Sequence, residues 1–197
     1  MQRDIHYRKA KTEGYRARSA YKLMEILEEY PVLKRARGVV DLCAAPGSWS
    51  QVVASQTDNC RILAIDIQEM EPIQGVEVIK GDITTEETVQ MILSRFPDKV
   101  DLILCDGAPE VTGLHDLDEY FQASLIGASL GICRRVLAAD GVFITKVFTG
   151  ESPAELVADL EEVFAEVEIV KPKSSRIKSK EAFAICKGLG KGRSNSF

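Results

Sequence analysis

Apolar residues along the chain follow two alternating patterns. Short continuous apolar runs are typical of strands buried on both faces of a sheet, and they alternate with stretches in which apolar residues recur at helical spacing. The runs predict strands at 38–43, 61–67, 75–79, 100–105, 141–148, 166–171 and 181–187. The helical spacing predicts helices at 16–30, 49–56, 84–96 and 116–137, with one more beginning near residue 153.

Residues at the predicted helix starts and in the last connection refine this pattern. Thr84 and Glu87 fit a capping box, and Ser152, Pro153 and Glu155 suit the N-cap, N1 and N3 positions of the next helix. The last two strands are joined by only about nine residues, too few for a right-handed helical crossover. We therefore expect the final strand to run antiparallel.

Alternating strands and helices predict a mostly parallel sheet with helices on both faces. With seven strands and an antiparallel last strand, this α/β arrangement is the outline of the class I (Rossmann-like) methyltransferase fold. A chain of 197 residues is long enough for one well-packed domain, so we expect residues 1–197 to form a single domain. The fold by itself does not establish a function.

Composition narrows the class of protein. A hydrophobic fraction of 45% and a charged fraction of 28% are those of a globular protein. No apolar run approaches the roughly 20 residues of a membrane span, and the N-terminus lacks the apolar core of a signal peptide. The scattered cysteines favour buried, reduced thiols over a metal site, because neither histidine lies near a cysteine pair in sequence. We therefore expect a cytoplasmic protein.

The net charge of −5 is unevenly distributed along the chain. A basic N-terminal segment, residues 1–37, carries +5 and residues 171–197 carry +7, whereas 38–170 carries −17. The short tail at 188–197 is also basic. Two interpretations remain open: two solvated basic ends, or a phosphate-binding surface where the ends meet.

The turn after the first strand indicates a nucleoside ligand. Only Gly47 follows Pro46 there, whereas a pyrophosphate needs more bare backbone amides. Asp66 ends the second strand, where an acid holds ribose hydroxyls, and Asp82 follows the third strand, where it could meet an amino group. Each of these also fits a helix cap, and Trp49 alone also fits a core position. Together they favour S-adenosylmethionine over NAD.

Several motifs carry a resemblance to a known family over nearly the whole chain. They are GYRARSAYKL, VDLCAAPGSWSQV, AIDIQ, GDIT, DLILCDGAP, FITKVF and EAFAICKG. The chain is similar to the FtsJ/RrmJ family of RNA 2′-O-ribose methyltransferases. Within that family, residues 106–120 and 171–176 resemble the eukaryotic branch that modifies the tRNA anticodon loop, at position 32 and at wobble position 34.

The resemblance implies a catalytic tetrad: Lys22, Asp106, Lys146 and Glu181. Lys146 would be the general base, which requires its neutral form. Partial burial and nearby positive charge favour that form, whereas Asp106 and Glu181 favour the charged form. The role of the two acids would be to orient the lysines through hydrogen bonds. The resemblance also implies S-adenosyl-L-methionine as the methyl donor, and no metal is required. The implied cofactor contacts are Gly47, Trp49, Asp66, Asp82 and Asp106.

RNA binding is expected at the two basic ends, because phosphate contacts position a nucleic acid. The candidate residues are Arg3, Arg8, Lys9, Arg16, Arg18, Lys171, Lys173 and Arg176. The resemblance further implies tRNA as substrate and separate WD-repeat and helical-repeat partner proteins that direct site choice. The chain departs from the branch at Thr149 and Glu151, where arginines are expected, which weakens the assignment of these two positions to RNA contact.

Three other functions fit parts of the sequence. The same chemistry on ribosomal RNA or an mRNA cap is the first alternative. A catalytically silent scaffold would not need all four tetrad residues. A dinucleotide-dependent oxidoreductase would need a second glycine near Pro46 and has no use for Lys22, so we set it aside.

Overall fold

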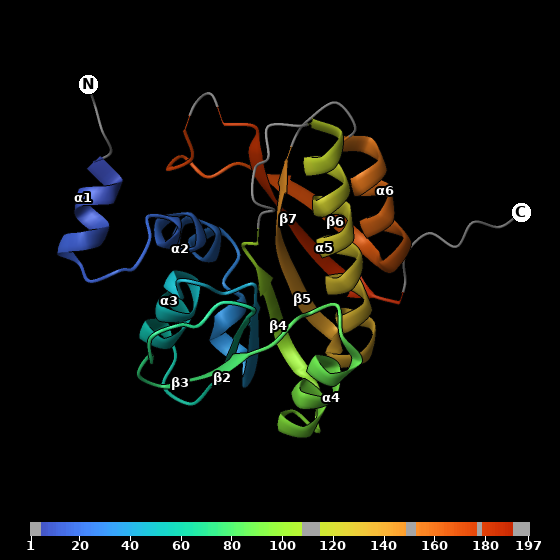
Figure 1. Cartoon of the computed structure of the whole chain (residues 1–197), viewed down its shortest axis with the longest axis horizontal. Helices are drawn as coiled ribbons and strands as arrows, with labels where there is room; N and C mark the ends of the chain where they lie inside the picture. The colour runs from blue at the N-terminus through green and yellow to red at the C-terminus, as the bar shows by residue number, and fades with distance from the viewer. Residues whose placement is uncertain (1–4, 108–114, 149–152, 177–178, 191–197) are drawn as a thin grey trace, which may run out of the picture.

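The computed structural model describes residues 5–107, 115–148, 153–176 and 179–190. Its centre is a seven-stranded sheet in the order β3-β2-β1-β4-β5-β7-β6 (Figure 1). Neighbouring strands are parallel except that β7 is antiparallel to both β5 and β6. The strands are β1 Gly38–Leu42, β2 Arg61–Asp66, β3 Val76–Lys80, β4 Val100–Cys105, β5 Leu137–Phe148, β6 Phe164–Val170 and β7 Glu181–Leu189. The predicted mixed α/β sheet and its antiparallel last strand are confirmed.

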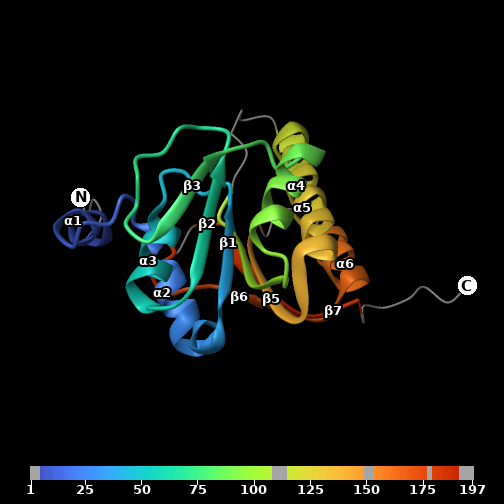
Figure 2. The same ribbon diagram turned by 90° about the horizontal axis from the view of Figure 1, so that it is seen from below.

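Helices cover both faces of this sheet, as Figure 2 shows. The helices α2 (Ser19–Glu29) and α3 (Ser48–Gln56) pack on one face, and α4 (Glu86–Arg95), α5 (His115–Val136) and α6 (Pro153–Val163) pack on the other. Successive residues of a central strand therefore enter two different cores, which is why β1 is buried along its whole length. No helix in the described part of the chain is long and apolar enough to cross a membrane.

The strands β1 and β4 lie side by side in the middle of the sheet, and the strand order reverses between them. In open α/β sheets, ligands bind beyond the carboxyl ends of strands at such a point. The turn 43–47 after β1 and Asp106 after β4 therefore lie at the edge where a ligand is expected.

Two helix boundaries differ from the predictions. The predicted helix at 16–30 begins only at Ser19, and residues 5–12 form a separate helix, α1 (Ile5–Thr12), which the apolar pattern did not indicate. The capping box at Thr84 is wrong by one residue: Thr85 caps α4 and accepts from the Thr88 N–H. Thr84 instead donates its hydroxyl to Asp82, 2.7 Å away. Pro153 begins α6 as predicted, and Ser152 lies outside the described residues.

Candidate active site

Four charged side chains from four parts of the chain meet at the carboxyl edge of the sheet. Lys22 comes from α2, Asp106 follows β4, Lys146 lies near the end of β5, and Glu181 begins β7. Lys22 Nζ lies 2.5 Å from Glu181 Oε1. Lys146 Nζ lies 2.8 Å from Asp106 Oδ1 and 3.9 Å from Glu181 Oε2. The four predicted tetrad residues are thus joined by ion pairs into one cluster.

The reversed strand β7 explains how Glu181 reaches this edge. Glu181 pairs with Phe148 at the end of β5, and Lys146 pairs with Phe183. Because β7 is antiparallel, its first residue lies beside the last residues of β5. A parallel strand would have placed its first residue at the opposite edge of the sheet.

The side chains that form these ion pairs are largely shielded from solvent. The side chains of Lys22, Lys146 and Glu181 are 6%, 10% and 13% exposed. Burial alone would raise the pKa of Glu181, but the hydrogen bond from Lys22 and the charges of both lysines outweigh it and hold that pKa below its ordinary value. Ser175 Oγ adds a longer hydrogen bond to Glu181, at 3.4 Å. Glu181 is therefore an ionised carboxylate shared between two lysines.

Lys146 is held mainly by one residue. In addition to its ion pair with the Asp106 carboxylate, its Nζ donates to the Asp106 backbone carbonyl at 2.9 Å. Two acceptors from the same residue fix the position of the amine at the end of β5. In its neutral form, an amine fixed in this way can receive a proton from a group brought to the sheet edge.

Asp66 ties the two expected cofactor loops together. Its Oδ2 accepts from the Ala45 N–H at 2.9 Å, and its Oδ1 accepts from the Gln68 N–H at 2.8 Å. The side chain thereby links the end of β2 to the turn after β1, and only 8% of the residue is exposed. Asp66 lies where the sequence placed it, with both oxygens already engaged by the backbone.

Asp82 is exposed beyond β3. Its Oδ1 accepts from both the amide and the hydroxyl of Thr84, and these hydrogen bonds lower the pKa of Asp82. It is therefore an ionised carboxylate that also shapes the start of α4. The structure brings it to the same edge of the sheet as Asp66 and Asp106, because β1, β2, β3 and β4 are parallel neighbours.

Gly47 and Trp49 have clear structural roles. Gly47 has a φ of 105° at the N-cap of α3, and a Cβ there would lie 2.5 Å from Ile73 Cδ1. Trp49 is only 2% exposed, donates its indole N–H to the Ser19 carbonyl at 3.0 Å and packs 5.6 Å from the Phe183 ring. Its ring therefore belongs to the core between α3, α2 and β7, which is the core position that the sequence also allowed.

The connection between β6 and β7 carries the C-terminal group of basic residues. It lies above α2 in Figure 1, and Ser175 joins it to Glu181 of the tetrad. Lys171 Nζ donates to the Ser179 carbonyl at 2.6 Å, and Arg176 is exposed. These expected RNA contacts are therefore next to the tetrad.

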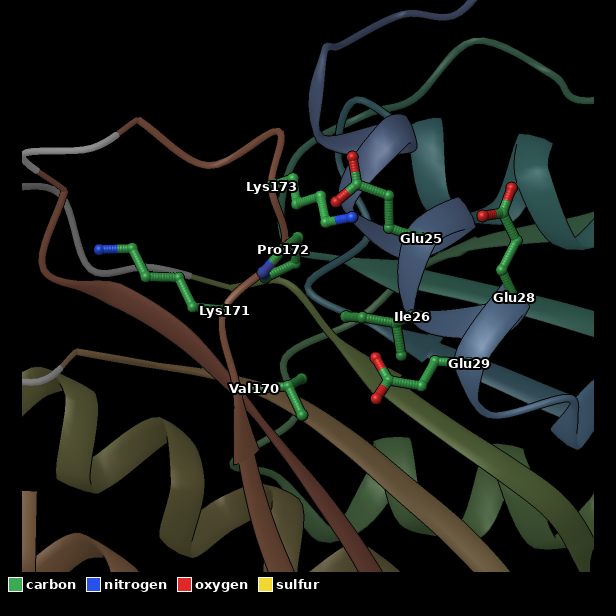
Figure 3. Close-up of a pocket in the computed structure, with 8 residues that line it drawn as sticks. All are labelled: Glu25, Ile26, Glu28, Glu29, Val170, Lys171, Pro172 and Lys173. Atoms are coloured by element: carbon green, nitrogen blue, oxygen red, sulfur yellow. The ribbon is translucent and has the colours of Figure 1, made fainter.

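A groove of about 490 Å³ separates this connection from α2 (Figure 3). Glu25, Glu28 and Glu29 line its α2 side. Lys173 extends across it toward α2, whereas Lys171 extends away. Both oxygens of Glu25 lie 3.2 Å from the Ser174 amide, which donates to them. The groove is thus bridged at one end by hydrogen bonds from the Ser174 backbone amide to the Glu25 carboxylate.

The N-terminal basic residues separate into two groups. Arg8 and Lys9 are exposed on α1, and Lys9 lies 3.8 Å from Glu13 and 5.0 Å from the Tyr21 ring. Arg16 is half-buried, and its guanidinium donates to three backbone carbonyls. Arg18 is half-buried before α2. Arg3 lies outside the described residues. Arg16 thus has protein partners where RNA phosphates were expected.

Two features near the site were missed from sequence, the fully buried Asp41 and the half-buried Cys43. Asp41 in β1 is fully buried, and its Oδ2 accepts from Ser50 Oγ at 2.6 Å. Cys43 has a φ of 54° and a hydrogen bond with Cys105 that raises the pKa of Cys43 and lowers that of Cys105 to about 7. An acid inside the apolar run at 38–43 was the available signal for Asp41.

All five cysteines are free, as predicted. Cys105, Cys133 and Cys186 are buried, whereas Cys43 and Cys60 are only half-buried, so the expectation of burial is wrong for these two. Within the described residues no group of three or more histidine, cysteine or acidic side chains could hold a metal ion. The absence of a metal requirement stays a prediction.

Comparisons with a family model and with individual known proteins agree on one family. A family model described as FtsJ-like methyltransferase matches residues 15–189. A Mus musculus tRNA (cytidine(32)/guanosine(34)-2′-O)-methyltransferase is 48% identical over 94% of this chain, which spans 59% of the relative's length. The Homo sapiens protein of the same description is 46% identical, and the chain spans 58% of it.

Two further matches are of a different description. A ribosomal RNA large subunit methyltransferase E of Pelagibacter ubique is 42% identical over 96% of this chain and 93% of the relative. A crystal structure described as a ribosomal RNA methyltransferase from Plasmodium falciparum superimposes with a TM-score of 0.78 at 30% identity. It covers 91% of this chain and 100% of that chain.

Proposed function

The chain belongs to the FtsJ-like methyltransferase family, and from this premise we propose that it methylates the ribose 2′-oxygen of nucleotides in the tRNA anticodon loop. The observation that carries the proposal is the cluster of Lys22, Asp106, Lys146 and Glu181 at the carboxyl edge of the sheet. It supplies a fixed amine, held by carboxylates, at the edge where α/β sheets bind ligands.

The residues at this edge fit S-adenosylmethionine. The ligand is a phosphate-free nucleoside with a cationic amino acid end, and the edge offers carboxylates at Asp66, Asp82 and Asp106 but no glycine-rich cradle of backbone amides. Asp66 would hold the ribose, Asp82 the adenine amino group, and Asp106 the cationic end. When bound, the cofactor supplies a methyl group on a sulfonium, which is already activated for transfer.

Lys146 is the general base in this proposal. Because Asp106 and Glu181 stabilise the charged form, Lys146 must first release its own proton, a loss that the positive charges of Lys22 and of the sulfonium favour. Its neutral Nζ then accepts the proton of the ribose 2′-hydroxyl as the oxygen becomes a nucleophile. Asp106 holds the amine in place through its carboxylate and its backbone carbonyl. Glu181 then shares the positive charge that forms on Lys146, while Lys22 neutralises the other oxygen of Glu181. Much of the acceleration comes from this positioning.

The tRNA substrate and positions 32 and 34 are supported by the descriptions of the mouse and human relatives. The basic residues of α1 and of the β6–β7 connection supply phosphate contacts on either side of α2. A loop nucleotide can be turned out to reach the tetrad at low energetic cost. WD-repeat and helical-repeat partner proteins that select the nucleotide, and action in the cytoplasm, belong to the same proposal.

Ribosomal RNA is the second candidate substrate. The Pelagibacter relative matches over 93% of its own length, so the match extends over nearly all of a protein of that description. Thr149 and Glu151, which replace the arginines expected in the anticodon-loop branch, lie outside the described residues. An assay must therefore offer both RNAs.

The test is methyl transfer from labelled S-adenosylmethionine to unmodified tRNA and, in parallel, to a ribosomal RNA transcript. Label should map to a 2′-oxygen at position 32 or 34 of tRNA. Lys146→Ala should lower the rate by roughly 10²- to 10⁴-fold, the usual contribution of a general base. Lys34→Ala is the matched control, because Lys34 is an exposed lysine on the 3-10 helix before β1, at the opposite edge of the sheet from the tetrad.

Three results would count against parts of the proposal. Label on ribosomal RNA alone would move the function to the second candidate. Label that survives Lys146→Ala would remove Lys146 as the base. Absence of label with both RNAs, even after addition of cell extract to supply a partner, would overturn the proposed activity.

A further inference from the structure

Arg16 joins two separate loops of the chain through three backbone carbonyls. It lies in the connection between α1 and α2. Its guanidinium nitrogen Nη1 donates to the Pro46 carbonyl at 3.0 Å and to the Glu71 carbonyl at 2.7 Å. Nη2 donates to the Pro72 carbonyl at 2.8 Å. The fork of the guanidinium thus spans two loops that follow neighbouring strands.

These two loops are the walls of the proposed cofactor site. Pro46 belongs to the turn after β1, and Glu71 and Pro72 belong to the connection that follows Asp66 at the end of β2. The loops also touch directly, because Ile73 Cδ1 lies against Gly47 so closely that a Cβ there would be 2.5 Å away. Asp66 links the same loops from inside through the Ala45 N–H. Arg16 links these two loops a second time, through its guanidinium.

The segment that carries Arg16 is itself fixed to α3. The Gln51 side chain accepts from the Arg16 N–H at 2.9 Å and donates to the Gly14 carbonyl at 3.1 Å. The Ser19 and Ser48 hydroxyls lie 2.8 Å apart. Arg16 therefore holds the loops from a fixed point, so that its position sets the distance between them.

We propose that Arg16 is a positioning residue for the cofactor, which holds the turn 43–47 and the loop 67–75 at the separation that S-adenosylmethionine requires. The inference rests on the proposed function. Carbonyl oxygens take three of the guanidinium N–H groups, and a planar fork is suited to bridging several acceptors in a way that a lysine ammonium on a single stem is not. Arg16 is thereby assigned to cofactor binding, not to RNA phosphates.

The test measures cofactor affinity without turnover. Trp49 is the single tryptophan of the chain and lies in α3 directly after the turn, so its fluorescence reports S-adenosylmethionine binding, with calorimetry as a check. Arg16→Ala should raise the dissociation constant about tenfold or more, the scale of losing hydrogen bonds from a charged donor. Arg16→Lys should recover only part of the affinity. The matched control is Arg35→Ala, an exposed arginine before β1, which should bind as the parent does.

Each other outcome is decisive. An unchanged dissociation constant in Arg16→Ala and Arg16→Lys, measured below the melting temperature of each, would overturn the inference even if stability fell. Weaker binding of tRNA with unchanged binding of S-adenosylmethionine would return Arg16 to the RNA contacts. Absence of S-adenosylmethionine binding by the unmodified chain would overturn the proposed function itself, before any variant is compared.

Discussion

Asp41 is fully buried in the middle of β1, beneath the turn that begins the candidate site. Burial raises the pKa of its carboxyl to about 8, although the hydrogen bond from Ser50 opposes the shift, and the nearby charge of Asp106 adds to it. Its Oδ1 has no hydrogen-bond partner among the described residues. A neutral carboxyl of this kind tethers the first turn of α3 to β1 at neutral pH without a buried charge.

We predict that Asp41 makes the protein less stable as pH rises. The unfolded chain loses this proton near pH 4, whereas the folded chain keeps it until about pH 8. Because the folded state then binds more protons, the free energy of unfolding falls across that window. Asp41→Asn keeps the shape and an acceptor for Ser50 but cannot ionise.

The measurement is urea unfolding of both proteins between pH 4 and pH 8. The free energy of unfolding of Asp41→Asn, relative to that of the parent, should increase by several kcal/mol as pH rises. Other groups titrate alike in the two proteins, so the difference isolates Asp41. A difference that stays constant with pH would show that Asp41 is ionised in the folded protein.

The sequence predicted well those helices and strands that are defined by apolar residues. It predicted less well the features that depend on polar contacts. The strands follow continuous apolar runs, and the structure keeps all seven. The helix α1 has few apolar residues and was missed, since a polar helix carries little periodic signal. The α4 cap was misplaced because Asp82 engages Thr84, and no local pattern tells which of two adjacent threonines a side chain two residues earlier will bind.

We predict that Gly47→Ala destabilises the start of α3. Its φ of 105° is unfavourable for a residue with a Cβ, by about 1–2 kcal/mol, and the added atom would meet Ile73. The matched control is Gly75→Ala, because Gly75 also has a positive φ, 78°, but no atom lies within 4 Å of its would-be Cβ.

Urea unfolding of both variants separates the two effects. Gly75→Ala measures the backbone strain alone, and any larger loss in Gly47→Ala measures the contacts of the added atom with Ile73 and with Arg16 Nη1, which would lie 3.2 Å away. Ile73→Ala should remove the share of that excess that comes from Ile73 and leave the strain. Equal losses at the two glycines, with and without Ile73, would show that the turn yields freely to the added methyl group.

Over the whole molecule, positive and negative charge are separated along the chain. The fold determines where the basic N-terminal segment and the basic β6–β7 connection lie relative to the tetrad. The four tetrad residues could be grouped from sequence only through the resemblance to a family, because they are up to 159 residues apart. Their convergence depends on the strand order and on the reversal of β7, of which only the reversal followed from loop length. The partners of Arg16 are backbone carbonyls, and no sequence pattern marks those.

We predict that tRNA binding is strongly salt-dependent and that it uses the basic residues near α2. The logarithm of the binding constant should fall linearly with the logarithm of salt concentration as counterions are released. Arg8→Ala, on exposed α1, should reduce that slope by about 1. Lys34→Ala removes the same charge from the 3-10 helix before β1, at the other edge of the sheet, and should leave the slope unchanged.

Filter binding or fluorescence anisotropy at several salt concentrations gives these slopes. Equal slopes for the parent, Arg8→Ala and Lys34→Ala would place the RNA away from α1. A reduced slope for Lys34→Ala would place it at the wrong edge for the tetrad to act.

The position of β7 also governs the order in which a newly made chain can assemble its sheet and the tetrad. Among the described residues, β6 pairs only with β7, and β7 lies between β6 and β5 although it is synthesised after both. Until residues 181–189 leave the ribosome, β5 ends the sheet with an open edge and β6 has no strand to join. The residue that begins this closing strand is Glu181, so the nascent chain completes its sheet and receives the last residue of the tetrad in a single event.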